Sequence, residues 1–231
     1  MSGPFLSRGM KVTLIAATWN EFEAAKVVLP RIDRKWVDEI IVVDGGSTDG
    51  TVEFCTAQGY TVFTQKERGY GAAMKEAAER AQGELIIEFP PDGNSLPEKV
   101  PDVIKKLQEG YDFVIASRYA PGARSDDDDF LTGIGNWGFT FLTNLLFWSS
   151  YTDVLVGFRG YRKSAYEKLD MTARGLDWSI QMPIQFRKKR VPVADIPAIE
   201  PARIGGVRKM RPFRTGLRIL RTLIKERCTL Y

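Results

Sequence analysis

The chain has 231 residues, of which 44% are hydrophobic and 27% are charged. This length and apolar content are typical of one sizeable α/β domain. No stretch reaches the roughly 20 consecutive apolar residues that span a bilayer, and residues 1–9 lack the apolar core of a signal peptide. We therefore expect a flexible tail over residues 1–9 and a cytoplasmic protein, either free or peripheral at the inner face of the membrane.

The chain contains no histidine. This excludes a Ser-His-Asp triad, a cysteine nucleophile paired with histidine, and zinc sites that use histidine. Any chemistry must therefore use carboxylates, Lys and Arg, hydroxyls, backbone amides or a hard metal ion bound through oxygen. The two cysteines, Cys55 and Cys228, lie far apart in the sequence. We expect both to be reduced, one in the core and one in the tail.

Apolar runs alternate with helical patterns along the first half of the chain, as in a mostly parallel sheet. The expected strands are 11–17, 39–43, 60–64, 84–89 and 113–117, and the expected helices are 23–32, 52–58, 71–81 and 97–108. The second half is less regular. Residues 121–129 indicate a mobile loop, and a helix is expected over 134–147. No linker divides the chain, so we predict an α/β fold in a single domain.

Three of the expected strands end in polar clusters. Asn20 and Glu21 follow the first strand, Asp44 follows the second, and Asp92 and Asn94 follow the fourth. In open α/β sheets, ligands bind beyond the carboxyl ends of the strands. We therefore expect Asp44 to bind a ribose or a base at the sheet edge and not to be a core group. The alternative is a turn that only closes a loop.

These clusters belong to an ordered set of motifs that resembles the family 2 glycosyltransferases of the GT-A fold, within them the dolichyl-phosphate mannose synthase-like branch. The set comprises Ala17-Thr18-Trp19-Asn20-Glu21, the Asp44 to Thr51 segment, Pro90-Pro91-Asp92, Ala116-Ser117-Arg118-Tyr119, and Asp153 followed by Gly157-Phe158-Arg159. The resemblance implies a GT-A (Rossmann-like), mostly parallel sheet flanked by helices. It also implies a nucleotide-sugar-binding half over 10–119, an acceptor half over 120–212, and a basic amphipathic helix over 213–231.

The activity that the resemblance implies is inverting transfer of a sugar from a nucleotide diphosphate sugar, a GDP- or UDP-sugar, to an acceptor. The residues it assigns to the nucleotide sugar are Ala17, Thr18, Asn20, Glu21, Asp44, Gly46, Ser47, Arg68, Gly71, Lys75 and Pro91. Among these, the segment from Arg68 to Gly71 resembles a donor-side Gly-rich loop. Its backbone amides at a helix N-terminus suit a diphosphate or sugar hydroxyls.

A divalent cation, Mg²⁺ or Mn²⁺, is expected at the Asp92 strand end. Such an ion bridges the two phosphates and neutralises the departing diphosphate. Pro90 occupies the first position of the family's Asp-x-Asp motif, which leaves Asp92 as the catalytic ligand, with Asn94 two residues on. An aspartate and an amide oxygen can hold the ion when phosphates and water complete its shell. The alternative is that Asp92 and Asn94 only form a turn.

On the acceptor side, the resemblance assigns the phosphate of a polyprenyl phosphate to Arg118, Arg203 and Lys209. The planar guanidinium suits phosphate, and a surface ion pair is the alternative for Arg118. A phosphate acceptor needs no general base, since its second pKa is about 6, whereas a glycan hydroxyl needs a nearby carboxylate. Asp177, ahead of an amphipathic helix, is the candidate catalytic base or else an N-cap. Both kinds of acceptor stay open.

Positive charge gathers at the C-terminal end. From Arg203 onward nine basic residues accompany one acid, Glu226, a net charge of +8, so the preceding residues carry −4 of the total of +4. This indicates an anionic partner. No nucleic-acid-binding motif accompanies it, so nucleic acid is not expected. In the expected helix 213–227 a basic stripe adjoins an apolar one. The helix therefore either packs on its own domain or lies on an anionic bilayer.

Two other functions stay open. One is the same transfer to a glycan hydroxyl in polysaccharide synthesis, in which case Asp177 is essential. The other is a catalytically weak nucleotide-sugar-binding protein, which Pro90 in place of the first motif acid suggests. A nucleotidyltransferase is disfavoured because no Gly-Thr-Arg signature follows the first strand.

Overall fold

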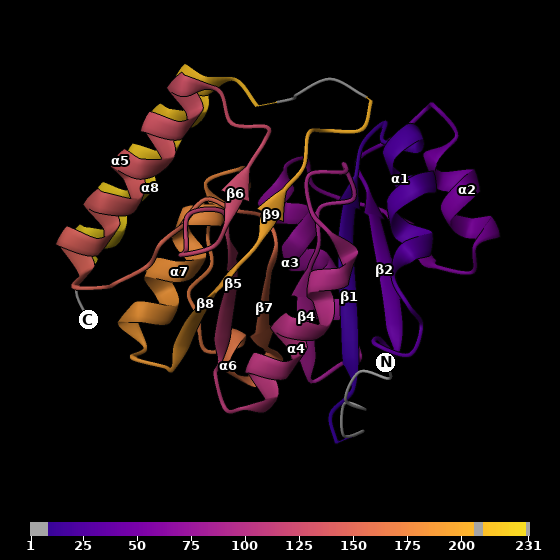
Figure 1. The fold of residues 1–231 in the computed structure, drawn as a ribbon, viewed down its shortest axis with the longest axis horizontal. Helices are drawn as coiled ribbons and strands as arrows, with labels where there is room; N and C mark the ends of the chain where they lie inside the picture. Colours follow the sequence, from indigo (N-terminus) through magenta and orange to yellow (C-terminus); the bar gives the residue numbers. More distant parts are fainter. Residues whose placement is uncertain (1–8, 206–209, 230–231) are drawn as a thin grey trace.

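The computed structural model describes residues 9–205 and 210–229, and its main feature is a seven-stranded sheet with the order β3-β2-β1-β4-β7-β5-β8 (Figure 1). The strands of this sheet are β1 (Val12–Thr18), β2 (Glu39–Asp44), β3 (Thr61–Thr64), β4 (Leu85–Glu88), β5 (Phe113–Ser117), β7 (Arg159–Arg162) and β8 (Val193–Pro197). Strand β7 runs antiparallel to β4 and β5, whereas the other pairings in the sheet are parallel. The predicted mostly parallel α/β sheet is confirmed.

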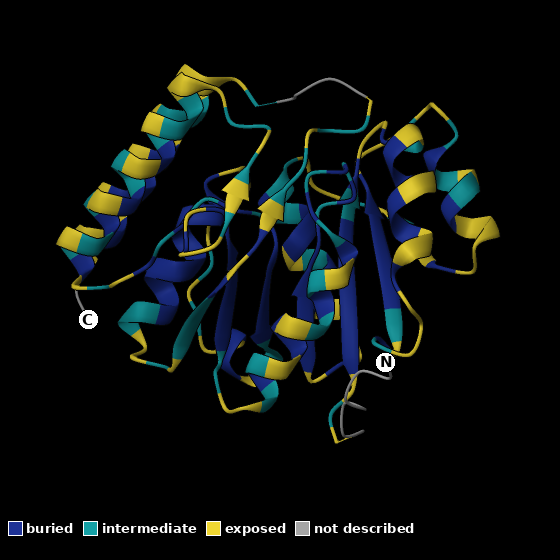
Figure 2. Ribbon diagram, viewed as in Figure 1, coloured by how far each residue is buried: buried dark blue, intermediate teal, exposed yellow. Residues whose placement is uncertain are grey.

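The centre of the sheet is the core of the molecule. Strands β1, β2, β4 and β5 are buried along nearly their whole length, as Figure 2 shows in dark blue. Continuous apolar runs are typical of parallel strands that are covered on both faces. The same runs made these strands visible in the sequence.

Helices cover both faces of the sheet. They are α1 (Phe22–Val28), α2 (Thr51–Ala57), α3 (Tyr70–Arg80), α4 (Val100–Gln108), α5 (Phe130–Phe147), α6 (Lys163–Tyr166), α7 (Trp178–Lys188) and α8 (Pro212–Cys228). Helix α4 lies in front of the sheet and packs on β4, β5 and β7, whereas α3 lies behind it and packs on β1 and β2 (Figure 1). The buried residues of α4 recur at positions i, i+3, i+4 and i+7, which gives it one apolar stripe.

The predicted elements of the first half agree with the structure to within a few residues. Two expected helices are each divided between an α-helix and a 3₁₀ turn, η1 (Leu29–Arg31) and η2 (Pro97–Lys99). Pro30 explains the first division, because proline has no N–H to continue the helical ladder. Cys55 is buried and Cys228 is exposed, and both are free thiols, as predicted.

Residues 121–129, predicted as a mobile loop, are partly in regular structure. They contain strand β6 (Arg124–Ser125), which pairs in parallel with β9 (Ile199–Glu200). Helix α5 begins at residue 130, four residues earlier than expected. The cause is Asp129, whose carboxylate accepts a hydrogen bond from the Thr132 N–H at 2.8 Å and caps the helix.

Helices α5 and α8 lie side by side at one end of the molecule (Figure 1). Helix α8 also packs on α7, with Ile219 and Leu223 buried. Its buried Glu226 accepts hydrogen bonds from Gln181 and Gln185 of α7 at 2.6 and 2.7 Å. The basic C-terminal helix therefore packs on its own domain. None of the helices in the described part of the chain is long and apolar enough to cross a membrane.

Candidate active site

A cleft of about 1220 Å³ opens where the parallel strands end. Its walls include residues that follow β1, β2, β3, β4 and β5, together with residues of α5 and α8. The predicted site residues that line it are Ala17, Thr18, Glu21, Gly46, Arg68, Pro91, Asp92, Asn94, Arg118 and Arg203. This is the position at which open α/β sheets bind ligands.

Other predicted site residues lie outside the lining of this cleft, namely Asn20, Asp44, Ser47, Gly71, Lys75 and Asp177. Lys75 is exposed on α3. Lys209 falls outside the described residues.

Asp44 is a buried group, so the expectation that it is not part of the core is wrong. Its side chain is 1% exposed. Oδ2 accepts the N–H groups of Gly46 and Ser47 at 2.7 and 2.8 Å. Oδ1 accepts the hydroxyls of Ser47 and Thr18 at 2.5 and 3.2 Å. Asp44 therefore shapes the turn after β2, and the turn, rather than the carboxylate, presents Gly46 to the cleft.

Asn20 and Ser47 join the turns that follow β1 and β2. The Asn20 N–H donates to Ser47 Oγ at 2.8 Å, and the Thr48 N–H donates to Asn20 Oδ1 at 2.8 Å. Both polar side chains thus tie the two turns together behind the lining of the cleft. They fix its shape and leave ligand contact to their neighbours.

Asp92 lies in the cleft and is held by an arginine from the far end of the sequence. Arg203 donates to Asp92 Oδ2 at 2.9 Å and to Glu21 Oε1 at 2.5 Å, so its guanidinium bridges the loops after β4 and β1. Burial raises the pKa of the Asp92 carboxyl, and the positive charge of Arg203 opposes that rise. The residue predicted to bind acceptor phosphate therefore reaches the predicted metal ligand.

The surroundings of Asp92 fit a hard cation that is only partly held by protein. Asn94 Oδ1 is buried and accepts no hydrogen bond from the described residues, while its Nδ2 donates to Asp127 Oδ2 at 2.9 Å. No group of three or more acidic or thiol side chains close enough to hold a metal exists among the described residues. An ion here would use Asp92 and Asn94 and take its remaining ligands from phosphates and water, as Mg²⁺ commonly does.

Arg118 is enclosed by carboxylates rather than free for an acceptor phosphate. The alternative interpretation was a surface ion pair, but Arg118 is buried. It is 9% exposed. It forms a bidentate pair with Asp153 at 2.7 and 3.0 Å. Its Nη1 lies 3.5 Å from Glu200 and 3.7 Å from Asp128. Three carboxylates thus compensate one guanidinium, which argues against a direct phosphate contact by Arg118.

Of the run of four aspartates, Asp127 lines the cleft. Asp127 contacts Asn94, and Asp128 accepts hydrogen bonds from the hydroxyl of Tyr119 and from Asn136 of α5. Asp129 caps α5. Sequence reasoning missed these roles because their partners lie in other segments, although Asp before an apolar helix is a recognisable N-cap signal.

The Gly-rich segment before α3 packs against protein. A Cβ atom on Gly69 would lie 2.1 Å from the Arg174 carbonyl oxygen, and one on Gly71 would lie 2.5 Å from that of Ala173. The Ala72 N–H already donates to the Arg174 oxygen at 3.2 Å. We therefore assign Gly71 to helix packing instead of ligand contact. Arg68 and Gly69 still line the cleft.

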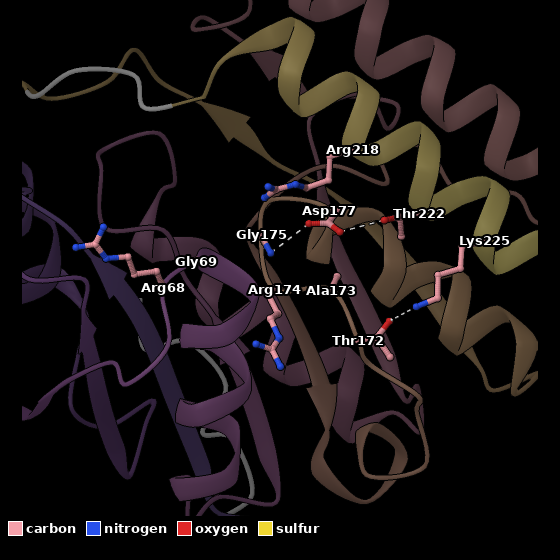
Figure 3. Close-up of a pocket in the computed structure, with 10 residues that line it drawn as sticks. All are labelled: Arg68, Gly69, Thr172, Ala173, Arg174, Gly175, Asp177, Arg218, Thr222 and Lys225. Carbon is pink, nitrogen blue, oxygen red and sulfur yellow. Dashed lines mark hydrogen bonds between the residues drawn. The ribbon is translucent and has the colours of Figure 1, made fainter.

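Asp177 lines a second, smaller pocket of about 340 Å³, which shares Arg68 and Gly69 with the main cleft (Figure 3). Its carboxylate accepts the Gly175 N–H at 3.2 Å and the Thr222 hydroxyl of α8 at 3.0 Å. Figure 3 shows the Arg68 side chain extending away from Asp177. Asp177 precedes α7 but makes no side-chain capping bond. Its carboxylate is committed to the loop and to α8.

A buried ion pair lies between β4 and β7 and was not predicted. Glu88 and Arg159 are opposed in the antiparallel register, and both are almost fully buried, with 3.6 Å between charged atoms. Glu88 also accepts from Trp178 Nε1 at 3.1 Å. Burial raises the pKa of Glu88, and Arg159 opposes that rise. A lone Glu inside an apolar strand was the available sequence signal.

This fold is shared with solved glycosyltransferases. Glucosyl-3-phosphoglycerate synthase from Mycobacterium tuberculosis, solved with Mn²⁺, UDP and glucosyl-3-phosphoglycerate, matches with a TM-score of 0.72 at 21% identity, over 96% of this chain and 81% of that one. The protein therefore has the GT-A fold. The family model for glycosyl transferase family 2 matches residues 13–170. The chain belongs to this family.

Curated relatives are similar over most of the chain. The dolichyl-phosphate hexose transferase of Haloferax volcanii is 28% identical over 93% of this chain and 92% of its own length. The polyprenol monophosphomannose synthase of Mycolicibacterium smegmatis is 26% identical over 87% of this chain and 81% of its own length. Both names state a polyprenyl-type acceptor for those proteins.

Proposed function

We propose that the protein transfers a hexose, with inversion, from a GDP- or UDP-sugar to a polyprenyl phosphate. The observation that carries this proposal is the two-part character of the cleft. One end holds charged groups, among them Asp92, Arg203 and Glu21, and the other is walled by apolar side chains of α5 and α8, among them Phe139 and Leu217. A polyprenyl phosphate has the same two parts, a charged head and an apolar chain.

The donor would bind at the strand ends, against the loops after β1, β2 and β4. Asp92 and Asn94 would hold the divalent ion, Mg²⁺ or Mn²⁺, which on binding would supply charge neutralisation for the departing diphosphate. The Gly46 turn would form one wall against the nucleotide. Its Gly46 and Ser47 N–H groups already donate to Asp44 Oδ2, which holds the turn in place. The Mn²⁺ found with the mycobacterial synthase supports a divalent ion in this class.

Arg203 would hold the acceptor phosphate beside the donor. Its guanidinium donates to Asp92 and Glu21, and its Nε–H donates to none of the described residues, so one donor remains for a ligand oxygen. A phosphate monoester is largely ionised near neutrality and attacks without a general base. The commitment of Asp177 to Gly175 and Thr222 favours this acceptor over a glycan hydroxyl.

A transfer assay tests the proposal. Labelled GDP- and UDP-hexoses are incubated with the protein and either polyprenyl phosphate or the matched polyprenol, with Mn²⁺ or with chelator. We expect label to enter the lipid phase only with the phosphate and the metal. Equal transfer to polyprenol would contradict the phosphate acceptor. Donor binding without transfer to either lipid would favour the binding-protein alternative, and transfer to a glycan that requires Asp177 would favour the hydroxyl acceptor.

A further inference from the structure

Helix α5 reverses the usual arrangement of a helix on a protein surface, because it buries polar side chains and exposes apolar ones. Residues 130–148 contain no charged side chain. The residues it buries are mostly polar, Asn136, Thr140 and Thr143 among them. Asn136 donates to the Tyr119 hydroxyl at 2.9 Å, and Thr140 Oγ1 accepts the Val154 N–H at 3.4 Å. Surface helices normally direct polar residues to water and apolar ones to the core.

The outer side of α5 is apolar instead. The large side chains that helical spacing places on this side are 51% to 85% exposed, and they are Phe130, Ile134, Trp137, Phe141, Leu145 and Trp148. Leu131, at 57%, lies off this stripe and lines the cleft. Trp137 and Phe141 stack on each other, with ring centroids 5.6 Å apart. An exposed apolar surface of this extent marks an interaction site.

Helix α8 extends this surface and adds positive charge. Its apolar stripe is also exposed, at 38% to 86%, and consists of Phe213, Leu217, Leu220 and Ile224. Helical spacing places Arg214, Arg218, Arg221 and Lys225 on the adjoining stripe. The acid of this helix, Glu226, is buried and paired with Lys188 at 2.6 Å. Arg218 and Lys225 extend into the smaller pocket, where Lys225 Nζ donates to Thr172 Oγ1 at 3.0 Å (Figure 3). We call the exposed apolar residues of both helices, with Arg214 and Arg221, the α5–α8 face.

We propose that the α5–α8 face docks on an anionic lipid bilayer. The outer side chains of α5 would enter the acyl region, and the cations of α8 would lie among the headgroup phosphates. Trp137 of α5 and Trp148 at its C-cap suit the membrane interface, where aromatic rings with one polar group concentrate. The exposed charges of the described parts of these two helices are all positive, which favours an anionic bilayer as the partner.

The role of this docking rests on the proposed function, which is transfer of a sugar to a lipid acceptor. The same two helices wall the apolar end of the cleft, through Leu131 and Phe139 of α5 and through Leu217 and Ile219 of α8, and Leu217 also belongs to the α5–α8 face. A bilayer beneath the α5–α8 face would therefore lie next to the cleft. A lipid acceptor could move in from the membrane without its chain crossing water.

Vesicle binding tests the proposal without donor, acceptor or metal, so its failure is distinguishable from failure of the transfer reaction. Wild-type protein should sediment with vesicles containing phosphatidylglycerol and much less with pure phosphatidylcholine. Trp137→Glu combined with Phe141→Glu should lower this binding at least about tenfold, because charged groups are costly below the headgroups. The matched control is Val27→Glu, on the exposed surface of α1 at 43% exposure, which should bind as the wild type does.

Two further experiments separate the contributions of charge and of apolar contact to vesicle binding. Arg214→Gln with Arg221→Gln should lower binding to anionic vesicles by roughly fivefold per residue and remove its salt sensitivity in part. Brominated lipids should quench tryptophan fluorescence in the wild type, and Trp137→Phe with Trp148→Phe should remove most of that quenching. Far-ultraviolet circular dichroism checks that each variant is folded.

Three outcomes would overturn the proposal. One is the absence of wild-type binding to anionic vesicles, and another is equal binding by the Trp137→Glu, Phe141→Glu variant. The third is a concentration-dependent dimer in sedimentation velocity that the same variant abolishes, because the α5–α8 face would then belong to a second copy of the chain.

Discussion

Two aspartates at neighbouring strand ends have different roles. Asp44 receives hydrogen bonds from its own turn and from Thr18, and its side chain is buried. Asp92 receives one backbone N–H, from Asn94, and otherwise contacts Arg203 inside the cleft. The same sequence signal, an acid after an apolar run, therefore marks a structural residue in one case and a candidate ligand in the other.

For Asp44, the structure predicts a loss of stability first. Asp44→Asn places an amide N–H₂ among groups that are donors, so at least one buried donor loses its acceptor. We expect the free energy of unfolding to fall by about 2–3 kcal/mol, measured by urea denaturation. The control Asp126→Asn, at an exposed pair with Arg124, should change it by less than about 0.5 kcal/mol. Unchanged stability of Asp44→Asn would show that the turn does not need the carboxylate.

For Asp92, the expected effect is on activity. Asp92→Asn keeps the size of the side chain but removes the charge that a metal ion and Arg203 both require. We expect kcat/KM for sugar transfer to fall roughly 100-fold or more, a size typical for loss of one charge-stabilising group. The melting temperature should change little. Activity of the variant at the wild-type level, with the same dependence on Mn²⁺, would place the ion elsewhere.

At the scale of elements, α3 depends on a close approach that the sequence did not reveal. Gly71 lies where a Cβ would meet the Ala173 carbonyl oxygen at 2.5 Å, and its φ is not positive. The glycine is therefore needed for space and not for backbone conformation. Ala173 is 102 residues away along the chain, so no local pattern could have indicated this role.

A pair of glycine variants tests this interpretation. Gly71→Ala should shift α3 away from residues 173–174 and lower the free energy of unfolding by about 1–3 kcal/mol, the usual cost of overpacking. Gly133→Ala, in α5, meets nothing within 4 Å and should raise stability by up to about 1 kcal/mol. Thermal or urea unfolding of both variants gives the comparison. If Gly71→Ala were as stable as the wild type, the packing role would be wrong.

The strands and most helices could be predicted from the sequence because burial on both sides leaves continuous apolar runs, as in β1 and β2. The start of α5 could also have been found from Asp129. The environment of Arg118 could not, because Asp128, Asp153 and Glu200 come from three segments that only the fold brings together. The same holds for Arg203, which reaches Asp92 across 111 residues.

For the whole molecule, positive charge lies outside on α8 while several carboxyl groups are buried. Burial raises the pKa values of Glu88, Asp195 and Glu200. A carboxyl group with a raised pKa in the folded state binds its proton more tightly there than in the unfolded chain. Its contribution to stability is therefore present below the ordinary pKa and lost as pH rises through the folded pKa.

Asp195 allows this to be tested. Asp195 accepts hydrogen bonds from the N–H and the hydroxyl of Thr152 at 2.5 and 2.6 Å, and an asparagine oxygen can accept both. Because asparagine does not ionise, Asp195→Asn should become more stable relative to the wild type as pH rises above the usual aspartate pKa of 3.8. Urea unfolding at pH 4 and pH 7 measures the difference. A difference that moves the other way would mean that the pKa of Asp195 is lowered.

Calorimetric titration measures whether the cleft beyond the strand ends binds a nucleoside diphosphate through a divalent ion held by Asp92. GDP and UDP are titrated into the wild type and into Asp92→Asn, each with Mn²⁺ and with chelator. We expect one nucleotide to bind the wild type with Mn²⁺, and chelator or Asp92→Asn to weaken this binding by at least about tenfold, or about 1.4 kcal/mol. Equal affinity in all four conditions, or no binding of either nucleotide, would contradict it.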